Sequence, residues 1–142
     1  MKLIIQKAST RWQGGSNGGT RAITTESGVL KETGFSASFT RNSETNPAEL
    51  IAAALAASFS LALSNELRLA GSASGGIIVT ATVTLEHAAS GWTIMNIHLN
   101  VNARLPRVTQ SKFIDAIVRA KTNCMVSRLL RATISMNAKL ER

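Results

Sequence analysis

Hydrophobic and polar residues alternate in short runs over the first third of the chain. Apolar positions recur every second residue in these runs, and glycine, serine and asparagine separate them, which is typical of strands joined by turns. The glycine-rich segment Gly14–Gly19 is the clearest of the turns. We expect strands at residues 1–13 and Arg21–Thr25, and extended segments at Val29–Lys31 and Phe35–Thr40 that continue them into a β meander.

A helix start follows at Asn46-Pro47-Ala48-Glu49. Asparagine can cap free amides, proline suits the first helical position, and a glutamate at the third position can complete a capping box. The pattern predicts a helix to about Ala70 that ends at Gly71. Its middle, residues 50–63, is apolar on nearly every side and must be buried all round. One chain of this size can hardly cover such a helix, so we expect a homodimer that shares it.

The second half of the chain alternates twice more. Two alternating runs lie on either side of a turn at 88–91, which predicts a pair of half-buried antiparallel strands. The expected inward residues are Ile77, Val79, Ala81, Val83 and Leu85 on the first strand, and Thr93, Met95, Ile97, Leu99 and Val101 on the second.

Helical spacing returns near the C-terminus. An amphipathic helix is expected from Thr109 to Lys121, a short helix from Cys124 to Arg131, and then a last strand. The apolar helix face comprises Phe113, Ile114, Ile117 and Val118, and the strand comprises Ala132, Ile134, Met136, Ala138 and Leu140. The order βββ–α–ββ–α–α–β predicts an α+β fold with a buried central helix, in a single domain over residues 1–142.

Composition supports a folded protein of this size. The chain has 142 residues, of which 44% are hydrophobic and 17% charged, so it can bury a core without metals or disulfides. Its one cysteine excludes a disulfide within the chain. The apolar run from Leu50 to Leu63 is shorter than the ~18–20 residues of a membrane span. We expect a cytoplasmic protein with no membrane partner.

Positive charge is concentrated in the last third. Lysine and arginine number 16 against 8 acidic residues, a formal net charge of +8, and most of the excess follows Val101. Such a surface can attract nucleic acid or an acidic partner. Aromatic residues are only 4%, and no helix-turn-helix or zinc motif is visible, so nucleic-acid binding is the least favoured alternative.

Few residues have a spacing that suggests chemistry. Neither His87 nor His98 has a carboxylate or second histidine at ligand spacing, so we expect no metal site and no cofactor. Cys124 lies where a helix begins, between Lys121 and Arg128, and both features favour a thiolate. A small buried residue that happens to begin a helix explains the same pattern.

Several motifs in register resemble the OsmC/Ohr family of osmotically inducible and organic hydroperoxide resistance proteins. They are Asn46-Pro47-x-Glu49-Leu50-Ile51-x-Ala53-Ala54-x-Ala56-Ala57-Ser58-Phe59-Ser60, Thr80-Ala81-x-Val83-x-Leu85 and Ala120-Lys121-x-x-Cys124-x-Val126-Ser127. Residues 25–30 resemble the OsmC branch. The resemblance implies an intertwined homodimer with sheets wrapped around two long central helices. It also implies a peroxidase in which a peroxidatic cysteine on the central helix and a later resolving cysteine form a disulfide that a dithiol reduces.

This chain departs from the family pattern at the implied site. The peroxidatic position falls on Ser58 and the resolving position on Cys124, while the arginine and glutamate that assist the thiolate fall on Ser38 and Ala48. A serine hydroxyl neither ionises at neutral pH nor offers an oxidisable sulfur. Three departures at one site are typical of natural divergence.

The resemblance therefore predicts a stress-family protein without the two-cysteine peroxidase activity. Its pocket would take a small organic hydroperoxide or another apolar ligand. Two alternatives stay open: a one-cysteine thiol peroxidase that uses Cys124 with an external thiol, and a basic surface that binds nucleic acid or an acidic partner. A dithiol reductant is a partner only if the protein is active.

Overall fold

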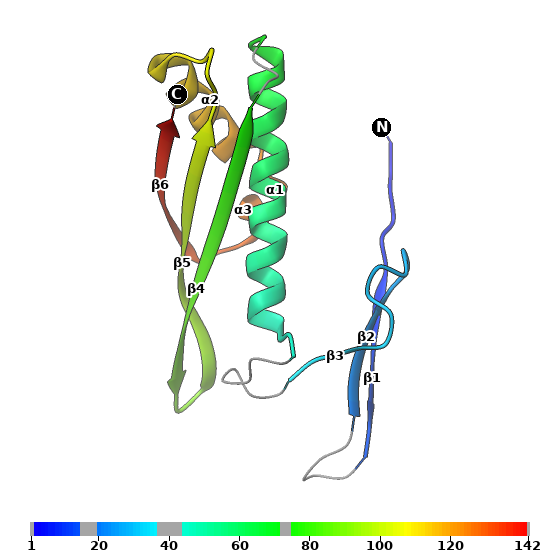
Figure 1. Cartoon of the computed structure of the whole chain (residues 1–142). Helices are drawn as coiled ribbons and strands as arrows, with labels where there is room; N and C mark the ends of the chain where they lie inside the picture. The colour runs from blue at the N-terminus through cyan, green and yellow to red at the C-terminus, as the bar shows by residue number, and fades with distance from the viewer. Residues whose placement is uncertain (1, 15–19, 37–43, 72–74, 142) are drawn as a thin grey trace. The chain divides into compact units, whose positions relative to one another are not determined.

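The computed structural model describes residues 2–14, 20–36, 44–71 and 75–141 (Figure 1). The chain divides into two compact units, Met1–Pro47 and Ala48–Arg142, and each is described by itself. Strands and helices follow one another in the predicted α+β order.

The first unit is a small antiparallel sheet. Strands β1 (Ala8–Gln13), β2 (Thr20–Thr25) and β3 (Thr33–Gly34) pair in that order. The predicted strand over residues 1–13 is too long, because β2 ends at Thr25 and leaves residues 2–7 without a strand to pair with. Most of the predicted Gly14–Gly19 turn lies outside the described residues.

The predicted strand at Val29–Lys31 is wrong. Hydrogen bonds from Thr25 N to Leu30 O (2.8 Å) and from Leu30 N to Thr25 Oγ1 (3.1 Å) close a tight loop there, and Gly28 supplies a φ of 79°. Of the predicted strand at Phe35–Thr40, the described part makes one isolated bridge, between Phe35 and Thr45.

Helix α1 (Pro47–Leu69) opens the second unit, with the bounds that its capping sequence predicts. It ends where Gly71 takes a φ of 82°, a conformation that favours glycine. Leu55, Phe59 and Leu63 are spaced four residues apart and form one buried stripe. Within the second unit the helix is not buried on every side as predicted: Leu61, for example, is 68% exposed.

A three-stranded sheet packs against α1 (Figure 1). Strand β5 (Gly91–Arg104) is central; β4 (Gly76–Ala88) pairs with it antiparallel and β6 (Thr133–Glu141) parallel. A parallel pair needs a crossover connection. Helices α2 (Gln110–Asn123) and α3 (Met125–Leu129) provide it, and the Thr109 side chain caps α2 by accepting from Lys112 N (3.2 Å).

The inward residues of β5 differ from the prediction at one end. Register shifts between β4 and β5, so that Thr84 pairs with Asn96 but Leu85 pairs with Ile94. Between this bulge and the start of β5, each residue of β5 therefore points to the face opposite to the one that simple alternation predicts. Ile94 therefore packs against the core, whereas Thr93 and Met95, predicted to face inward, are exposed.

Half of the predicted apolar face of α2 is also exposed. Phe113 and Ile117 are buried as predicted, and the buried stripe continues through Ala116 and Ala120. Ile114 and Val118 lie on the edge of the helix away from this stripe, and both are more than half exposed. The contact face of α2 is thus narrower and lined by smaller residues than hydropathy alone indicates.

By length and composition alone α1 could cross a membrane, contrary to the estimate from residues 50–63. The core helix of a soluble protein passes the same test. We interpret α1 as such a helix because its buried stripe belongs to the core of the unit, together with Ile97, Leu99 and Val101 of β5 and Phe113 of α2.

Candidate functional site

Ser58 and Cys124, 66 residues apart in the sequence, meet inside the second unit. Ser58 lies on the buried side of α1, and Cys124 lies between α2 and α3, where it is the C-cap of one and the N-cap of the other. The Ser58 Oγ is 3.2 Å from the Cys124 Sγ. Both residues are buried, and the cysteine has no exposed surface. The structure therefore brings together two of the four positions that the resemblance singled out.

The remaining hydrogen bonds orient this pair. Val126 N donates to the Ser58 Oγ (3.4 Å), which leaves the serine O–H free to point at the sulfur. Behind the thiol, the Cys124 carbonyl accepts from the Ser127 Oγ (3.0 Å) and from Arg128 N (3.2 Å). The thiol thus faces hydroxyl groups and backbone amides, and no charged side chain is among its hydrogen-bond partners in the described residues.

These surroundings act on the ionisation of the thiol in opposite directions. Burial raises the pKa of Cys124. Hydrogen bonds from the side chains of Ser127 and Ser58, together with the amides of Ser127 and Val126, outweigh burial and lower the pKa below that of an ordinary cysteine. Cys124 therefore forms a thiolate more readily than an unperturbed cysteine does.

The other two singled-out positions are not brought to the thiol by any described contact. Ala48 is buried in the first turn of α1 and offers only a methyl group. Ser38 lies outside the described residues. No charged group from either position acts on the Ser58–Cys124 pair in the part of the chain that the structure describes.

A second polar cluster lies further along α1, and the sequence reasoning missed it. Glu66 is only 6% exposed, and its carboxylate accepts from Arg119 Nε (2.8 Å) and from Asn123 Nδ2 (2.9 Å). Asn123 directly precedes Cys124, so this cluster holds the same α2–α3 junction. A carboxylate two turns beyond Ser58 on a helix predicted to be buried is the sequence signal that could have revealed it.

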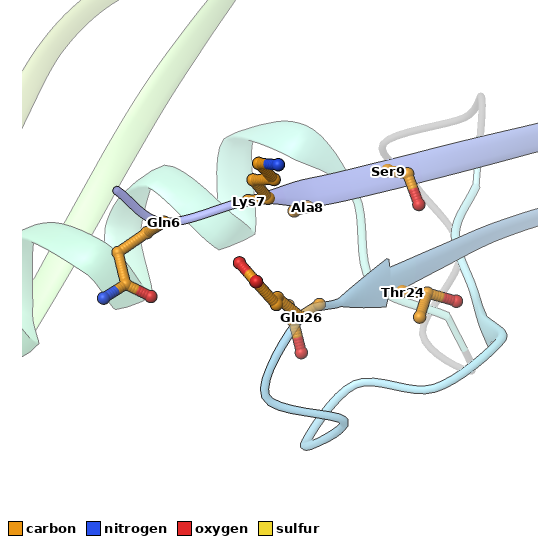
Figure 2. Close-up of a pocket in the computed structure, with 7 residues that line it drawn as sticks. Gln6, Lys7, Ala8, Ser9, Thr24 and Glu26 are labelled. Carbon is orange, nitrogen blue, oxygen red and sulfur yellow. The ribbon is translucent and has the colours of Figure 1, made fainter. Parts of the chain in front are cut away.

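Two further kinds of site were sought in the described ranges. Histidine, cysteine and acidic residues form no group of three that could hold a metal ion there. The first unit has a hollow of about 510 Å³ lined by Gln6, Lys7, Ala8, Ser9, Thr24, Thr25 and Glu26. Figure 2 shows its polar side chains pointing in different directions, so they do not converge on a ligand.

The sequence has close relatives of known family. The family described as OsmC-like protein matches residues 40–139. Peroxiredoxin OsmC of Escherichia coli (strain K12) is 39% identical over 140 residues, which cover 97% of this chain and 98% of that protein.

Solved structures share the fold. An OsmC-like protein from Mycoplasma pneumoniae has a TM-score of 0.80 at 11% identity, covering 98% of this chain and 99% of that one. An organic hydroperoxide resistance protein from Elizabethkingia anophelis has a TM-score of 0.75 at 24% identity, covering 99% and 98%. At these identities the likeness concerns the fold alone. The α+β class predicted from the order of elements is confirmed, and so is the OsmC-like fold that the resemblance implies.

Proposed function

Because this chain belongs to the OsmC-like protein family, we propose that it serves in the hydroperoxide stress response of that family without a two-cysteine peroxidase cycle. The relative from Escherichia coli is a peroxiredoxin by name. In this chain the site that would carry that chemistry pairs one thiol, Cys124, with one hydroxyl, Ser58. We propose that the pocket around them binds a small apolar ligand.

The contact between Ser58 and Cys124 is the observation that carries this proposal. A thiolate reduces a hydroperoxide by attacking the O–O bond: one oxygen goes to sulfur as a sulfenic acid, and the other leaves as an alcohol. A second thiol then displaces water from the sulfenic acid to form a disulfide. The Ser58 hydroxyl can do neither step, since it has no sulfur to oxidise. At 3.2 Å it can only hydrogen bond to the remaining thiol.

A one-cysteine peroxidase is the second candidate, and the lowered pKa of Cys124 favours it. The Cys124 thiolate would take one oxygen from the hydroperoxide and release an alcohol. Two external thiols would then restore the Cys124 thiol. The first reacts with the sulfenic acid to form a mixed disulfide and water; the second attacks this mixed disulfide, which frees Cys124 and joins the two external thiols in a disulfide. The full burial of the sulfur opposes this route, because a peroxide and a thiol must both reach it.

We also propose that the protein is a soluble homodimer. The open face of α1 carries Ala53, Ala54, Ala57 and Leu61, all exposed in the isolated subunit. A continuous apolar face of this kind is typical of a surface that another chain covers. A second copy that brings the same face would bury both, and small alanine side chains allow two helices to approach closely.

A turnover assay tests the proposal. The unmodified chain is mixed with cumene hydroperoxide and dithiothreitol, with Cys124→Ser as the control. We expect consumption of the peroxide by the unmodified chain to be no faster than by the control. Fast consumption that depends on the dithiol and disappears in Cys124→Ser would overturn the proposal and establish the one-cysteine peroxidase instead.

A further inference from the structure

A cavity of about 200 Å³ lies inside the second unit, next to the Ser58–Cys124 pair. Its lining residues come from α1, from the inner face of β5 and β6, and from the two helices α2 and α3 that connect these strands. The lining residues are Phe59, Leu99, Lys121, Ser127, Ile134 and Met136. Two of them adjoin the thiol site: Phe59 follows Ser58 on α1, and Ser127 donates to the Cys124 carbonyl.

The size and lining of the cavity define the tail of a ligand. Four of its six lining side chains are apolar, from Phe59, Leu99, Ile134 and Met136. An apolar cavity of about 150 Å³ in another protein is large enough for a benzene molecule. A cavity of about 200 Å³ therefore accommodates an apolar group of about six carbons. Longer chains would have to extend into solvent.

The two polar lining residues define the head group. Lys121, in the last turn of α2, is exposed and forms no ion pair with any residue in the described ranges. Because Lys121 lines the cavity and is also exposed, its flexible side chain can bring a positive charge to a ligand held in the apolar space. The Ser127 hydroxyl is directed at Cys124: it donates to the Cys124 carbonyl and helps to lower the pKa of the thiol, so a ligand would find it mainly as an acceptor. The one strong donor available to a ligand is the lysine, and its natural counterpart is an anion.

We propose that this cavity binds a small hydrophobic carboxylate, with the tail packed among Phe59, Leu99 and Met136 and the carboxylate paired with Lys121. The inference rests on the proposed function, for which it names the ligand class. The net charge of +8 attracts anions to the surface in general, and at this cavity one of the positive charges lies beside an apolar space that can hold a ligand's tail. A bound ligand would contact Ser127, and through it the backbone that holds the thiol.

Titration calorimetry with hexanoate as the probe tests this site on the full chain. We expect one hexanoate per chain, and binding weaker by about tenfold or more in Lys121→Gln, since a hydrogen-bonded charge pair contributes that much. Hexanol, which has the same tail without the charge, should bind the unmodified chain no better than hexanoate binds Lys121→Gln. The matched control is Lys112→Gln, an exposed lysine of α2 that does not line the cavity; its affinity should be unchanged.

A cavity-filling variant supplies the second arm. Met136→Phe adds volume where the tail would lie, and we expect it to weaken hexanoate binding while circular dichroism reports an unchanged fold. Equal binding of hexanoate by Lys121→Gln, or no binding by the unmodified chain, would overturn the inference. Hexanoate has no O–O bond, so these results are separate from the turnover assay. If hexanoate does not bind, the proposal that the protein lacks two-cysteine peroxidase activity is unaffected. If the protein consumes hydroperoxide fast, the result of the hexanoate titration is unaffected.

Discussion

In the part of the chain that the structure describes, polar contacts join α1 to the α2–α3 segment at two places, and the two places differ in kind. At one, the neutral Ser58 hydroxyl meets the Cys124 thiol at 3.2 Å. At the other, the Glu66 carboxylate is held by Arg119 and Asn123 at 2.8 and 2.9 Å. Both lie on the buried side of the same helix, and both fix the same turn of chain.

The difference separates a structural contact from a chemical one. The Glu66 carboxylate has both oxygens occupied, so it has little capacity for a ligand and its role is to hold α1 against α2. The thiol at Cys124 has neutral partners and a pKa below the ordinary value. Of the two contacts, the one at the sulfur therefore offers a reactive group, and the one at Glu66 helps to hold the chain that carries the sulfur. Each of the following predictions changes one of the two contacts.

Ser58→Cys has the largest expected effect, because it turns the neutral contact into a covalent one. The Oγ–Sγ distance of 3.2 Å must shorten to the ~2.0 Å of an S–S bond, a small movement. The disulfide would close a loop of more than 60 residues and stabilise the oxidised protein by about 4 kcal/mol. Mass spectrometry should show the loss of two hydrogens per chain, and denaturant unfolding should give the stability.

Ser58→Cys also tests whether hydroperoxide turnover needs the arginine and glutamate of the family pattern, which fall on Ser38 and Ala48. The new thiol alone should be a weak nucleophile, because burial raises the pKa of a thiol. We expect useful hydroperoxide turnover only when Ser38→Arg and Ala48→Glu are added to Ser58→Cys. If Ser58→Cys stays fully reduced under mild oxidation, the two side chains are not placed to form a disulfide and the role assigned to position 58 fails.

Arg119→Ala breaks the charged contact and comes next in size. It leaves the buried Glu66 carboxylate with Asn123 as its remaining described partner, and an unpaired buried charge is costly. Because Arg119 is itself about half exposed, we expect the lower end of the usual range, a loss of about 3 kcal/mol in the free energy of unfolding. Arg131→Ala, at an exposed position outside the helices and strands, should change it by less than about 0.5 kcal/mol. A loss no greater than that of Arg131→Ala would show that the Glu66 contact is unimportant to stability.

The elements of the fold were largely predictable from the sequence. Helix α1 follows from the Asn46-Pro47 start and the stop at Gly71, and the order of helices and strands along the chain follows from hydrophobic periodicity. The inward face of β5 was partly mispredicted because a bulge at Met95 is a property of pairing with β4, which local hydropathy does not record. The exposure of Ile114 and Val118 was not predicted for a similar reason, because packing against the sheet decides which apolar residues of a helix are buried.

The candidate site was predictable only in part. Spacing marked Cys124 as a thiol at a helix start, and resemblance to a family added Ser58. The contact between them spans 66 residues, a separation over which periodicity gives no information. The Glu66 cluster has no motif, because Arg119 and Asn123 lie on a different helix and are four residues apart. Such long-range polar contacts became visible only in the structure.

Ser58→Ala is the smallest change, and it tests whether the neutral contact controls the thiol. The change removes two hydrogen bonds of the Ser58 Oγ, one with the Cys124 Sγ and a long one from Val126 N, and should cost about 1–2 kcal/mol of stability. Because the Ser58 side chain helps to lower the pKa of Cys124, its loss should raise that pKa, although Ser127 and the amides remain. Titration of the thiolate by its ultraviolet absorbance measures the shift.

The sign of the pH dependence follows from the direction of that pKa. A thiol whose pKa is lower in the folded state than in the unfolded state stabilises the fold fully above the unfolded pKa, and this contribution is lost as pH falls through the folded pKa. The unmodified chain should therefore gain stability as pH rises through that window, and Ser58→Ala should gain less. Cys124→Ser, which has no titrating sulfur, should show no gain from this source. If Ser58→Ala and the unmodified chain titrate alike, Ser58 does not tune the thiol, and Ser127 with the backbone amides accounts for the lowered pKa of Cys124.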